Sequence, residues 1–200
     1  MNNVLDDAAL CRIRDGGLVV YPTETIYGLG CIATDAAAVA RLFEVKGREP
    51  GKPPPLLVAD EAMLSTLVQE IPVVARQLMR RHWPGALTLV LRARSSLPSL
   101  VTGSNAQGQM TVAVRRSAHP VAQEICAKLQ APLVATSANF AGATGNEAAA
   151  RSLQDVTPEL LRRVDIVLDG GTVGGLPSTI VDCSGDAPHV LRQGALQLDL

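Results

Sequence analysis

Small polar and charged side chains follow several short apolar runs in this chain, where they could bind a ligand. The clearest case comes after the apolar run at 18–21, where Pro22 is followed by Thr23, Glu24 and Thr25. A purely structural turn is richer in Gly, Asn or Asp, whereas hydrogen-bonding groups at a strand end are typical of ligand sites in open α/β sheets. The segment therefore indicates a binding site, although threonines that only cap backbone groups would look the same.

Two cations, Lys46 and Arg48, flank Gly47 where a predicted helix ends, and a proline-rich loop follows. A point charge beside a guanidinium fork suits a polyphosphate. Cations at a helix C-terminus also complement the helix dipole, so the motif alone leaves both interpretations open. We expect both side chains to face solvent before a nucleotide arrives, and the loop at 49–55 to close over it.

The predicted strand at 110–115 ends in an arginine. Its alternation places Thr111, Ala113 and Arg115 on one face. An arginine buried at the end of an apolar strand needs an anionic partner. That partner is either a carboxylate on a ligand or a structural Asp, and the sequence leaves the choice open.

Hydroxyl, amide and guanidinium groups mark three further strand boundaries. Ser137 and Asn139 follow the predicted strand at 132–136, where they suit a nucleotide or an amino acid as well as a helix N-cap. Ser178 precedes one of the last two predicted strands, and Arg192 ends the other. Ser137 lacks the G-x-S-x-G surroundings of a catalytic nucleophile, so binding is the better interpretation.

These groups together comprise hydroxyls, an amide and cations, without a catalytic triad or a cluster of metal ligands. His119 precedes Pro120 and a predicted helix, which favours a turn residue over a general base. Such a set suits the binding and positioning of anionic substrates. In adenylation the substrate carboxylate is itself the nucleophile, so a protein mainly orients it and neutralises phosphate charge.

The composition is that of a globular domain with an aliphatic core. The chain has 200 residues, of which 47% are hydrophobic, but only one Trp, two Tyr and two Phe, so Val, Leu, Ala and Ile must fill the interior. The net charge of −1 argues against a protein that coats nucleic acid through its overall charge. It leaves room for a local basic cleft.

The cysteines point to a reducing compartment. Cys11, Cys31, Cys126 and Cys183 form no Cys-x-x-Cys pair and no Cys/His cluster with metal spacing, so we expect each to fill a small buried site. The chain shows no charged-then-apolar leader and no apolar run of membrane-spanning length. We therefore expect a cytoplasmic protein without a membrane partner.

Predicted helices and strands alternate along the chain. Helices are predicted at 6–15, 36–45, 61–69, 72–82 and 120–129, and further helical segments follow a loop at 137–146. Strands are predicted at 18–21, 56–59, 87–91, 110–115, 132–136, 166–168, 179–182 and 189–192. The alternation predicts an α/β fold, and because not every connection is long enough for a parallel crossover, we expect a mixed sheet.

An ordered set of motifs carries a resemblance to a known family. The motifs are Pro22-Thr23-Glu24-Thr25-Ile26-Tyr27-Gly28-Leu29, Lys46-x-Arg48, Trp83-Pro84-Gly85, Val112-Ala113-Val114-Arg115, Ser137-Ala138-Asn139, Ser178-Thr179-Ile180-Val181-Asp182 and Leu191-Arg192-x-Gly194. Over about residues 10–196 the chain resembles the YrdC-like family of L-threonylcarbamoyl-AMP synthases. The resemblance implies one domain over residues 1–200, a twisted mixed α/β sheet with flanking helices and a concave basic cleft, in a short form without a C-terminal extension domain.

The resemblance also implies a reaction. L-Threonine, bicarbonate and ATP would give threonylcarbamoyl-AMP and pyrophosphate, with Mg²⁺ on the ATP phosphates and no metal held by protein side chains. The product would pass to a partner complex that modifies tRNA adenosine next to the anticodon, and tRNA itself would be a further partner.

Three sets of site residues follow from the resemblance. The set implied for L-threonine is Thr25, Arg115, Ser178 and the backbone of Ala135. The catalytic cations implied for the ATP phosphates are Lys46 and Arg48. The set implied for the rest of the nucleotide is Thr111, Ser137, Asn139 and Arg192.

The chain departs from the family pattern in two places. Glu49 follows Arg48 where many members have proline, in a loop longer than the common form, and Ala59-Asp60 replaces a histidine that contacts threonine in some members. Two alternatives therefore stay open. One is a family paralogue acting on another carbamoyl or acyl substrate. The other is a non-catalytic RNA-binding module, against which the scarcity of aromatic stacking platforms counts.

Overall fold

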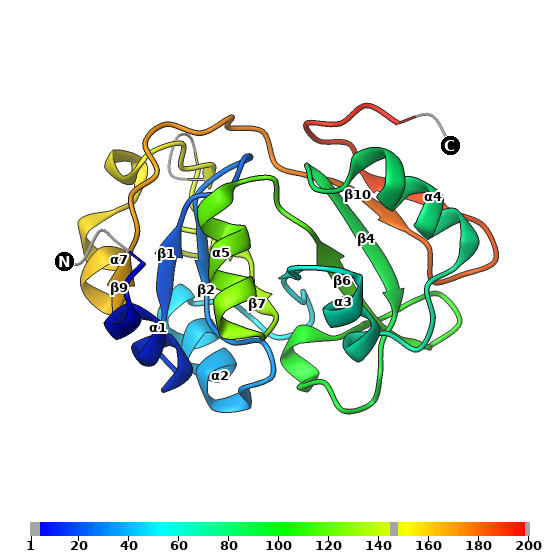
Figure 1. Cartoon of the computed structure of the whole chain (residues 1–200), viewed down its shortest axis with the longest axis horizontal. Helices are drawn as coiled ribbons and strands as arrows, with labels where there is room; N and C mark the ends of the chain where they lie inside the picture. The colour runs from blue at the N-terminus through cyan, green and yellow to red at the C-terminus, as the bar shows by residue number, and fades with distance from the viewer. Residues whose placement is uncertain (1–4, 145–147, 199–200) are drawn as a thin grey trace.

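The computed structural model describes residues 5–144 and 148–198, which form two mixed sheets with helices packed around them (Figure 1). The predicted mixed α/β fold is confirmed, with its strands divided between two sheets. Residues 1–4, 145–147 and 199–200 lie outside the described part. The ends of the domain predicted over 1–200 and the last two positions of the loop predicted at 137–146 fall among them.

The first sheet carries the segment that contains Thr25. It consists of β1 (Val19–Tyr21), β2 (Gly28–Gly30), β8 (Thr136–Ser137) and β9 (Ile166–Val167), in the order β8-β2-β1-β9. β1 runs antiparallel to β2 and parallel to β9. The chain reversal between β1 and β2 makes residues 22–27 a compact connection at one end of this sheet.

The second sheet contributes the opposite side of the site. Its strands are β3 (Leu56–Leu57), β4 (Leu87–Arg92), β5 (Gly103–Ser104), β6 (Met110–Arg115), β7 (Leu133–Val134), β10 (Thr179–Asp182) and β11 (His189–Arg192). Their order is β11-β10-β4-β6-β3-β7, with β5 paired to β6. β10 runs parallel to β4, whereas β4 and β6 are antiparallel.

The described helices, except the one that follows Pro72, each begin at a residue whose side chain caps the first turn. They are α1 (Asp7–Arg14), α2 (Ala36–Lys46), α3 (Glu61–Leu67), α4 (Val73–His82), α5 (Pro120–Leu129) and α7 (Pro158–Arg163), with short 3-10 turns at Ser99–Val101 and Leu153–Asp155. Asp35 accepts hydrogen bonds from the backbone of Ala37 and Ala38 at the start of α2, as expected of an N-cap. None of the described helices combines the length and the apolar character that crossing a bilayer requires.

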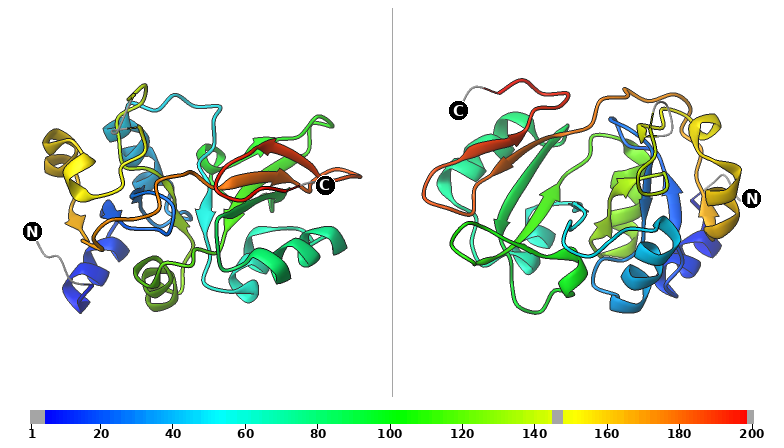
Figure 2. Two further views of the ribbon diagram at one scale, coloured as in Figure 1. Left: turned by 90° about the horizontal axis from the view of Figure 1, so that it is seen from above. Right: turned by 180° about the vertical axis from the view of Figure 1, so that it is seen from behind.

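Helices cover one face of the second sheet at β4. α3 and α4 lie along that face (Figure 2), where they share a buried core with the odd-numbered leucines of β4, Leu87, Leu89 and Leu91. Because successive side chains of a strand point to opposite faces, Thr88 and Val90 project the other way and line cavities instead. The alternation along β4 therefore divides core from site.

Two sequence-based expectations about the elements were wrong. The strand predicted at 132–136 is split into β7 and β8, because the backbone N–H of Ala135 donates to the Pro55 carbonyl at 2.8 Å while the residues on either side pair in different sheets. Neither β2 nor β5 was predicted. Of the cysteines, three are buried as expected, but Cys11 is exposed because α1 buries Ala9, Leu10 and Ile13 on its other side.

Candidate functional site

Three adjoining cavities, all lined in part by Arg48, contain every residue predicted for the site. The central cavity, of about 290 Å³, is lined from both sheets and includes Thr25, Arg48, Arg115, Ala135, Ser137, Ser178 and Arg192. The α2 cavity, of about 570 Å³, adds Lys46 and Asn139. The β6 cavity, of about 670 Å³, adds Thr111 and also contains Arg48 and Arg192. The structure therefore brings all ten predicted residues together.

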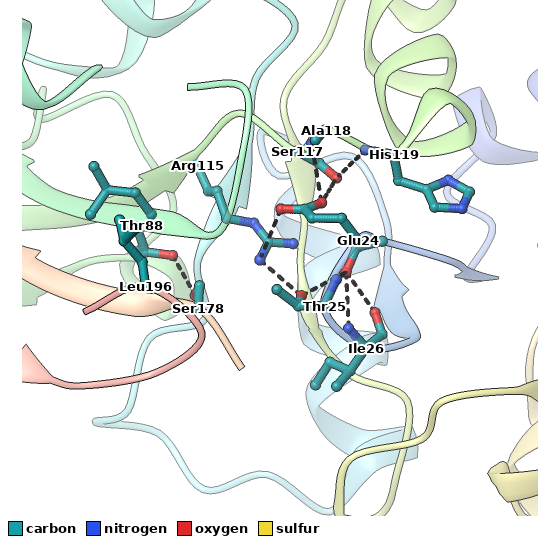
Figure 3. A network of polar contacts seen from close by, with 12 residues as sticks. Glu24, Thr25, Ile26, Thr88, Arg115, Ser117, Ala118, His119, Ser178 and Leu196 are labelled. Carbon is teal, nitrogen blue, oxygen red and sulfur yellow. Dashed lines mark hydrogen bonds and ion pairs between the residues drawn. The ribbon is translucent and has the colours of Figure 1, made fainter. Parts of the chain in front are cut away.

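Thr25 and Arg115 meet at one end of the central cavity (Figure 3). Arg115 Nη1 donates to Thr25 Oγ1 at 2.9 Å, and the Thr25 hydroxyl lies 2.8 Å from that of Thr23. The Thr23 hydroxyl donates to the Ile26 carbonyl at 2.7 Å. Because a hydroxyl has one proton to give, Thr25 must donate to Thr23, which fixes its acceptor lone pairs toward Arg115.

Glu24 holds this end of the site in place, although it was not among the predicted site residues. Its Oε2 accepts hydrogen bonds from the Ser117 hydroxyl and from the Ala118 N–H (Figure 3). Its Oε1 lies 3.7 Å from Arg115 Nη1, and that buried oxygen accepts no hydrogen bond from the described residues. The pair is close enough to attract but leaves the guanidinium free to approach a second anion.

The electrostatics at Arg115 favour an anionic ligand. Arg115 is only 5% exposed. Burial lowers its pKa, and the Glu24 carboxylate opposes that shift. A buried guanidinium with one incomplete ion pair gains from a carboxylate that can pair with it bidentately. The structural partner of Arg115 is thus Glu24 rather than an Asp. The 3.7 Å between Arg115 Nη1 and Glu24 Oε1 leaves the guanidinium able to bind a ligand carboxylate as well.

His119 has a structural contact, as predicted. Its Nδ1 accepts from the Val121 N–H at 3.3 Å and so caps α5. Burial lowers the pKa of His119, with Glu24 opposing the shift. The ring is thus engaged at the helix start and does not line the central cavity.

Ser178 and Arg192 line the central cavity from the β10–β11 part of the second sheet, which also carries Arg115 on β6. The Ser178 hydroxyl lies 2.8 Å from that of Thr88 on the neighbouring strand β4 (Figure 3). Arg192 Nη2 donates to the Ser178 carbonyl at 2.8 Å. Both contacts fix the chain directly before β10, so the Ser178 side chain points into the central cavity with a defined orientation.

Lys46 is buried, which corrects the expectation that it faces solvent. It is 3% exposed. Its Nζ lies within hydrogen-bonding distance of four oxygens: the carbonyls of Ser137 and Asn139 at 2.7 and 2.8 Å, Asn139 Oδ1 at 2.6 Å and Ser137 Oγ at 3.3 Å. These hydrogen bonds connect Lys46, the last residue of α2, to the segment 137–139 at the end of β8.

Burial and the surrounding oxygens have opposite effects on the pKa of Lys46. Burial, with a smaller effect from the neighbouring Arg48 guanidinium, lowers its pKa to about 7. The surrounding oxygens favour the ammonium form and oppose that shift. An incoming phosphate would add an anion beside Nζ and restore the positive charge.

Arg48 is also less exposed than predicted, because three groups hold its side chain. Nε donates to the Lys52 carbonyl at 2.8 Å, Nη1 donates to Thr136 Oγ1 at 3.1 Å, and the guanidinium carbon lies 5.8 Å from the centre of the Phe43 ring. Burial lowers the pKa of Arg48. The Lys52 contact connects this cation to the loop at 49–55 that was predicted to close the site.

The lining of the central cavity is basic. Its charged residues in the described part of the chain are Arg48, Arg115 and Arg192, and none of the described side chains that line it carries a carboxylate. Over residues 5–144 and 148–198, His, Cys, Asp and Glu side chains form no group of three that could hold a metal ion. The arrangement can therefore bind and orient anions, with hydroxyls to direct them.

Sequence reasoning missed three contributors to the site, namely Thr23, Glu24 and Thr88. Glu24 and Thr23 lie inside the motif that was singled out, but their partners are distant in sequence. Thr88 is a fully buried hydroxyl within an apolar strand. A polar residue among the apolar ones of the strand at 87–91 could have indicated that its face lines a site.

Comparisons with known proteins point to one family. The Sua5/YciO/YrdC family model, described as "Telomere recombination", matches residues 11–194. The threonylcarbamoyl-AMP synthase of Pyrococcus abyssi (strain GE5 / Orsay) is 40% identical over 188 residues, 94% of this chain and 53% of that protein. The chain thus spans about half the length of this relative.

Two further matches extend the comparison. The threonylcarbamoyl-AMP synthase of Stenotrophomonas maltophilia (strain K279a) is 40% identical over 186 residues, covering 91% of this chain and 95% of that protein. Among solved structures, P. abyssi Sua5 complexed with L-threonine superposes with a TM-score of 0.86 at 39% identity, covering 94% of this chain and 54% of that one.

Proposed function

The chain belongs to the Sua5/YciO/YrdC family, and from this premise we propose that it makes L-threonylcarbamoyl-AMP from L-threonine, bicarbonate and ATP, releasing pyrophosphate. The observation that carries the proposal is the convergence of all ten predicted residues on three adjoining basic cavities. Relatives of this name and a relative bound to L-threonine support it. The product would supply threonylcarbamoyl modification of tRNA.

Threonine binds, in this proposal, at the Thr25 end of the central cavity. The Arg115 guanidinium pairs with its carboxylate, because Glu24 leaves that cation only partly compensated. The hydroxyls of Thr25 and Ser178 orient the amino acid from opposite sheets, and the backbone of Ala135 borders the same cavity. Groups that are already fixed by hydrogen bonds lose little entropy when the substrate arrives.

ATP binds along the side shared with the other two cavities. Lys46 and Arg48 neutralise the phosphates, Ser137 and Asn139 border them, and Thr111 and Arg192 line the cavity proposed for the rest of the nucleotide. Arg48 exchanges its hydrogen bond to the Lys52 carbonyl for a phosphate oxygen. That exchange would couple phosphate binding to a movement of the loop at 49–55.

The chemistry needs no protein nucleophile. The neutral threonine amine attacks carbon dioxide and loses a proton, or attacks bicarbonate with loss of water, to give an N-carboxylate. An oxygen of this carboxylate then attacks the α-phosphorus while pyrophosphate leaves. The cations stabilise charge on the phosphates as the leaving group departs. Holding the N-carboxylate in line with the α-phosphorus accelerates the reaction further by positioning the reacting atoms.

Magnesium would enter with ATP. Among the residues that the structure describes, the lining of the central cavity offers guanidinium and hydroxyl groups rather than carboxylates, a donor set that does not fit a metal held by the protein. Mg²⁺ in this proposal is coordinated by the phosphates and neutralises part of their charge, while the residues named above act on the substrates themselves.

Release of pyrophosphate tests the proposal. The protein is incubated with ATP, bicarbonate and L-threonine, and pyrophosphate is measured with each substrate omitted in turn. Formation that requires all three supports the synthase. No threonine-dependent release from folded protein would overturn it. Tight RNA binding without ATP turnover would favour the RNA-binding alternative.

The paralogue alternative rests on the unusual loop after Arg48. Glu49 lines the α2 cavity, where it adds a negative charge near the proposed phosphates. A panel of amino acids in the same assay separates the two possibilities, because a synthase for L-threonine turns over threonine faster than serine, valine or alanine. Equal or better turnover of another amine would favour the paralogue.

A further inference from the structure

A fourth cavity, also basic, lies away from the proposed active site, against helices α3 and α4. It has a volume of about 200 Å³ and is lined by Glu61, Arg76, Met79, Arg80, Trp83 and Arg116. It shares none of these residues with the three cavities described above. Arg116 reaches it directly after Arg115, which points into the central cavity instead.

The charges in this cavity are not balanced. Glu61 forms an ion pair with Arg76. Within the described part of the chain, neither Arg80 nor the Arg116 guanidinium has a hydrogen bond or ion pair, and Arg116 Nε is a buried atom without a partner. Buried polar groups in native proteins are nearly always paired with protein, water or a ligand. The buried Arg116 Nε, with the exposed Arg80 guanidinium lining the same cavity, therefore leaves room for an anion.

Hydrogen bonds fix two of the residues that line the cavity, Arg116 and Trp83. The backbone N–H of Gly85 donates to the Arg116 carbonyl at 2.8 Å, which fixes Arg116 against the turn at 83–85. The Trp83 indole donates to the Leu87 carbonyl at 2.7 Å, which fixes the ring. The cavity volume of about 200 Å³ is several times the about 30 Å³ that one water occupies in the liquid, which leaves space for a small oxyanion.

We propose that Arg80 and Arg116, beside the Arg76–Glu61 pair and the Trp83 ring, form a second site that binds a phosphate group. Guanidinium groups bind phosphate oxygens through paired, charge-assisted hydrogen bonds. The group is either a free phosphate ion or a phosphate of an RNA backbone, which present the same oxygens to the site. The inference is independent of the proposed synthase activity.

The single tryptophan makes the test direct. Trp83 is the only Trp of the chain, so its fluorescence reports on this cavity. Sodium phosphate is titrated at constant ionic strength, followed by a short RNA duplex in a separate series. We compare the parent protein with Arg80→Gln, Arg116→Gln and Arg81→Gln. Arg81 is a matched control, since it is an exposed neighbour on α4 that does not line the cavity.

A saturable phosphate response that weakens about tenfold in Arg80→Gln, but not in Arg81→Gln, supports the site. Arg80 is exposed, so this variant should fold even if Arg116→Gln does not. An RNA response with the same dependence on Arg80 assigns the phosphate to RNA, and a response to free phosphate alone assigns it to the ion. No saturable response, or equal responses in Arg80→Gln and Arg81→Gln, would overturn the proposal.

Discussion

At the residue scale, burial disfavours the charged form of Lys46 that phosphate binding would need. The lysine is held by Ser137 and Asn139, and its pKa is lowered to about 7 from a usual 10.5. Between those two values the unfolded state binds more protons than the folded state, so this group makes stability rise with pH. Below pH 7 the cost of the buried charge is fully present.

Lys46→Met has no titratable group at this position, so comparing it with the parent protein isolates the contribution of Lys46. The free energy of unfolding of the parent protein should rise relative to that of Lys46→Met between about pH 7 and about pH 9, by at most about 1.4 kcal/mol per pH unit. Urea unfolding of both proteins across that range measures the difference, which cancels the titration of all other groups. A difference that does not change with pH would mean that Lys46 stays charged throughout.

Glu24 is the second residue whose substitution is informative. Glu24→Gln can retain the hydrogen bonds to Ser117 and Ala118 but removes the carboxylate that pairs with the buried Arg115. Because breaking a buried pair leaves an uncompensated charge, unfolding should become easier by about 2 kcal/mol. Glu44→Gln is the matched control, since Glu44 is exposed on α2 and has no ion pair within the described residues.

L-Threonine should partly reverse that loss if its carboxylate pairs with Arg115 as proposed. Thermal unfolding of Glu24→Gln would then shift upward with threonine by more than that of the parent protein. A threonine effect equal in Glu24→Gln and Glu44→Gln would place the carboxylate away from Arg115.

At the scale of elements, the end of β11 is locked against the residue before β10. A Cβ on Gly194 would overlap the Pro177 carbonyl oxygen and lie 2.6 Å from the Ser178 carbonyl carbon. Both are backbone atoms that cannot rotate away. Gly194→Ala should therefore cost roughly 1–3 kcal/mol of stability and displace Ser178 from the central cavity, which lowers turnover as well.

Gly185→Ala is the control for this substitution. Gly185 lies in the turn between the same two strands, and its nearest neighbour to a new Cβ is Gln107 Oε1 at 4.0 Å. Urea unfolding and pyrophosphate release are measured for both variants. Equal effects of Gly194→Ala and Gly185→Ala would show that the close approach at Gly194 does not position Ser178.

The elements also show what the sequence could reveal. α2 was predictable because Asp35 supplies a cap and the apolar residues repeat at helical spacing. β2 was not, because Gly28 and Gly30 have no strand propensity and become a strand only by pairing with β1. The burial of Lys46 was equally hidden, because the oxygens that surround it lie 91 and 93 positions away.

At the scale of the molecule, the site exists only because the two sheets adjoin. Thr25 and Ser137 approach it from the first sheet and its connection, whereas Arg115, Ser178 and Arg192 approach from the second. A motif search finds each group at its strand end. Only the packing of both sheets brings these groups within reach of one ligand.

A ligand that contacts both sheets should stabilise them as one unit. Bound at a hundred times its dissociation constant, ATP would add about 2.7 kcal/mol to the free energy of unfolding, and the protein should still unfold in one transition. Thermal unfolding with and without ATP measures the shift. Arg48→Gln should lose most of it, because Arg48 borders all three cavities of the site, whereas Arg162→Gln, at an exposed position on α7, should keep it. A transition that splits in two, with one half insensitive to ATP, would show that the nucleotide contacts a single sheet.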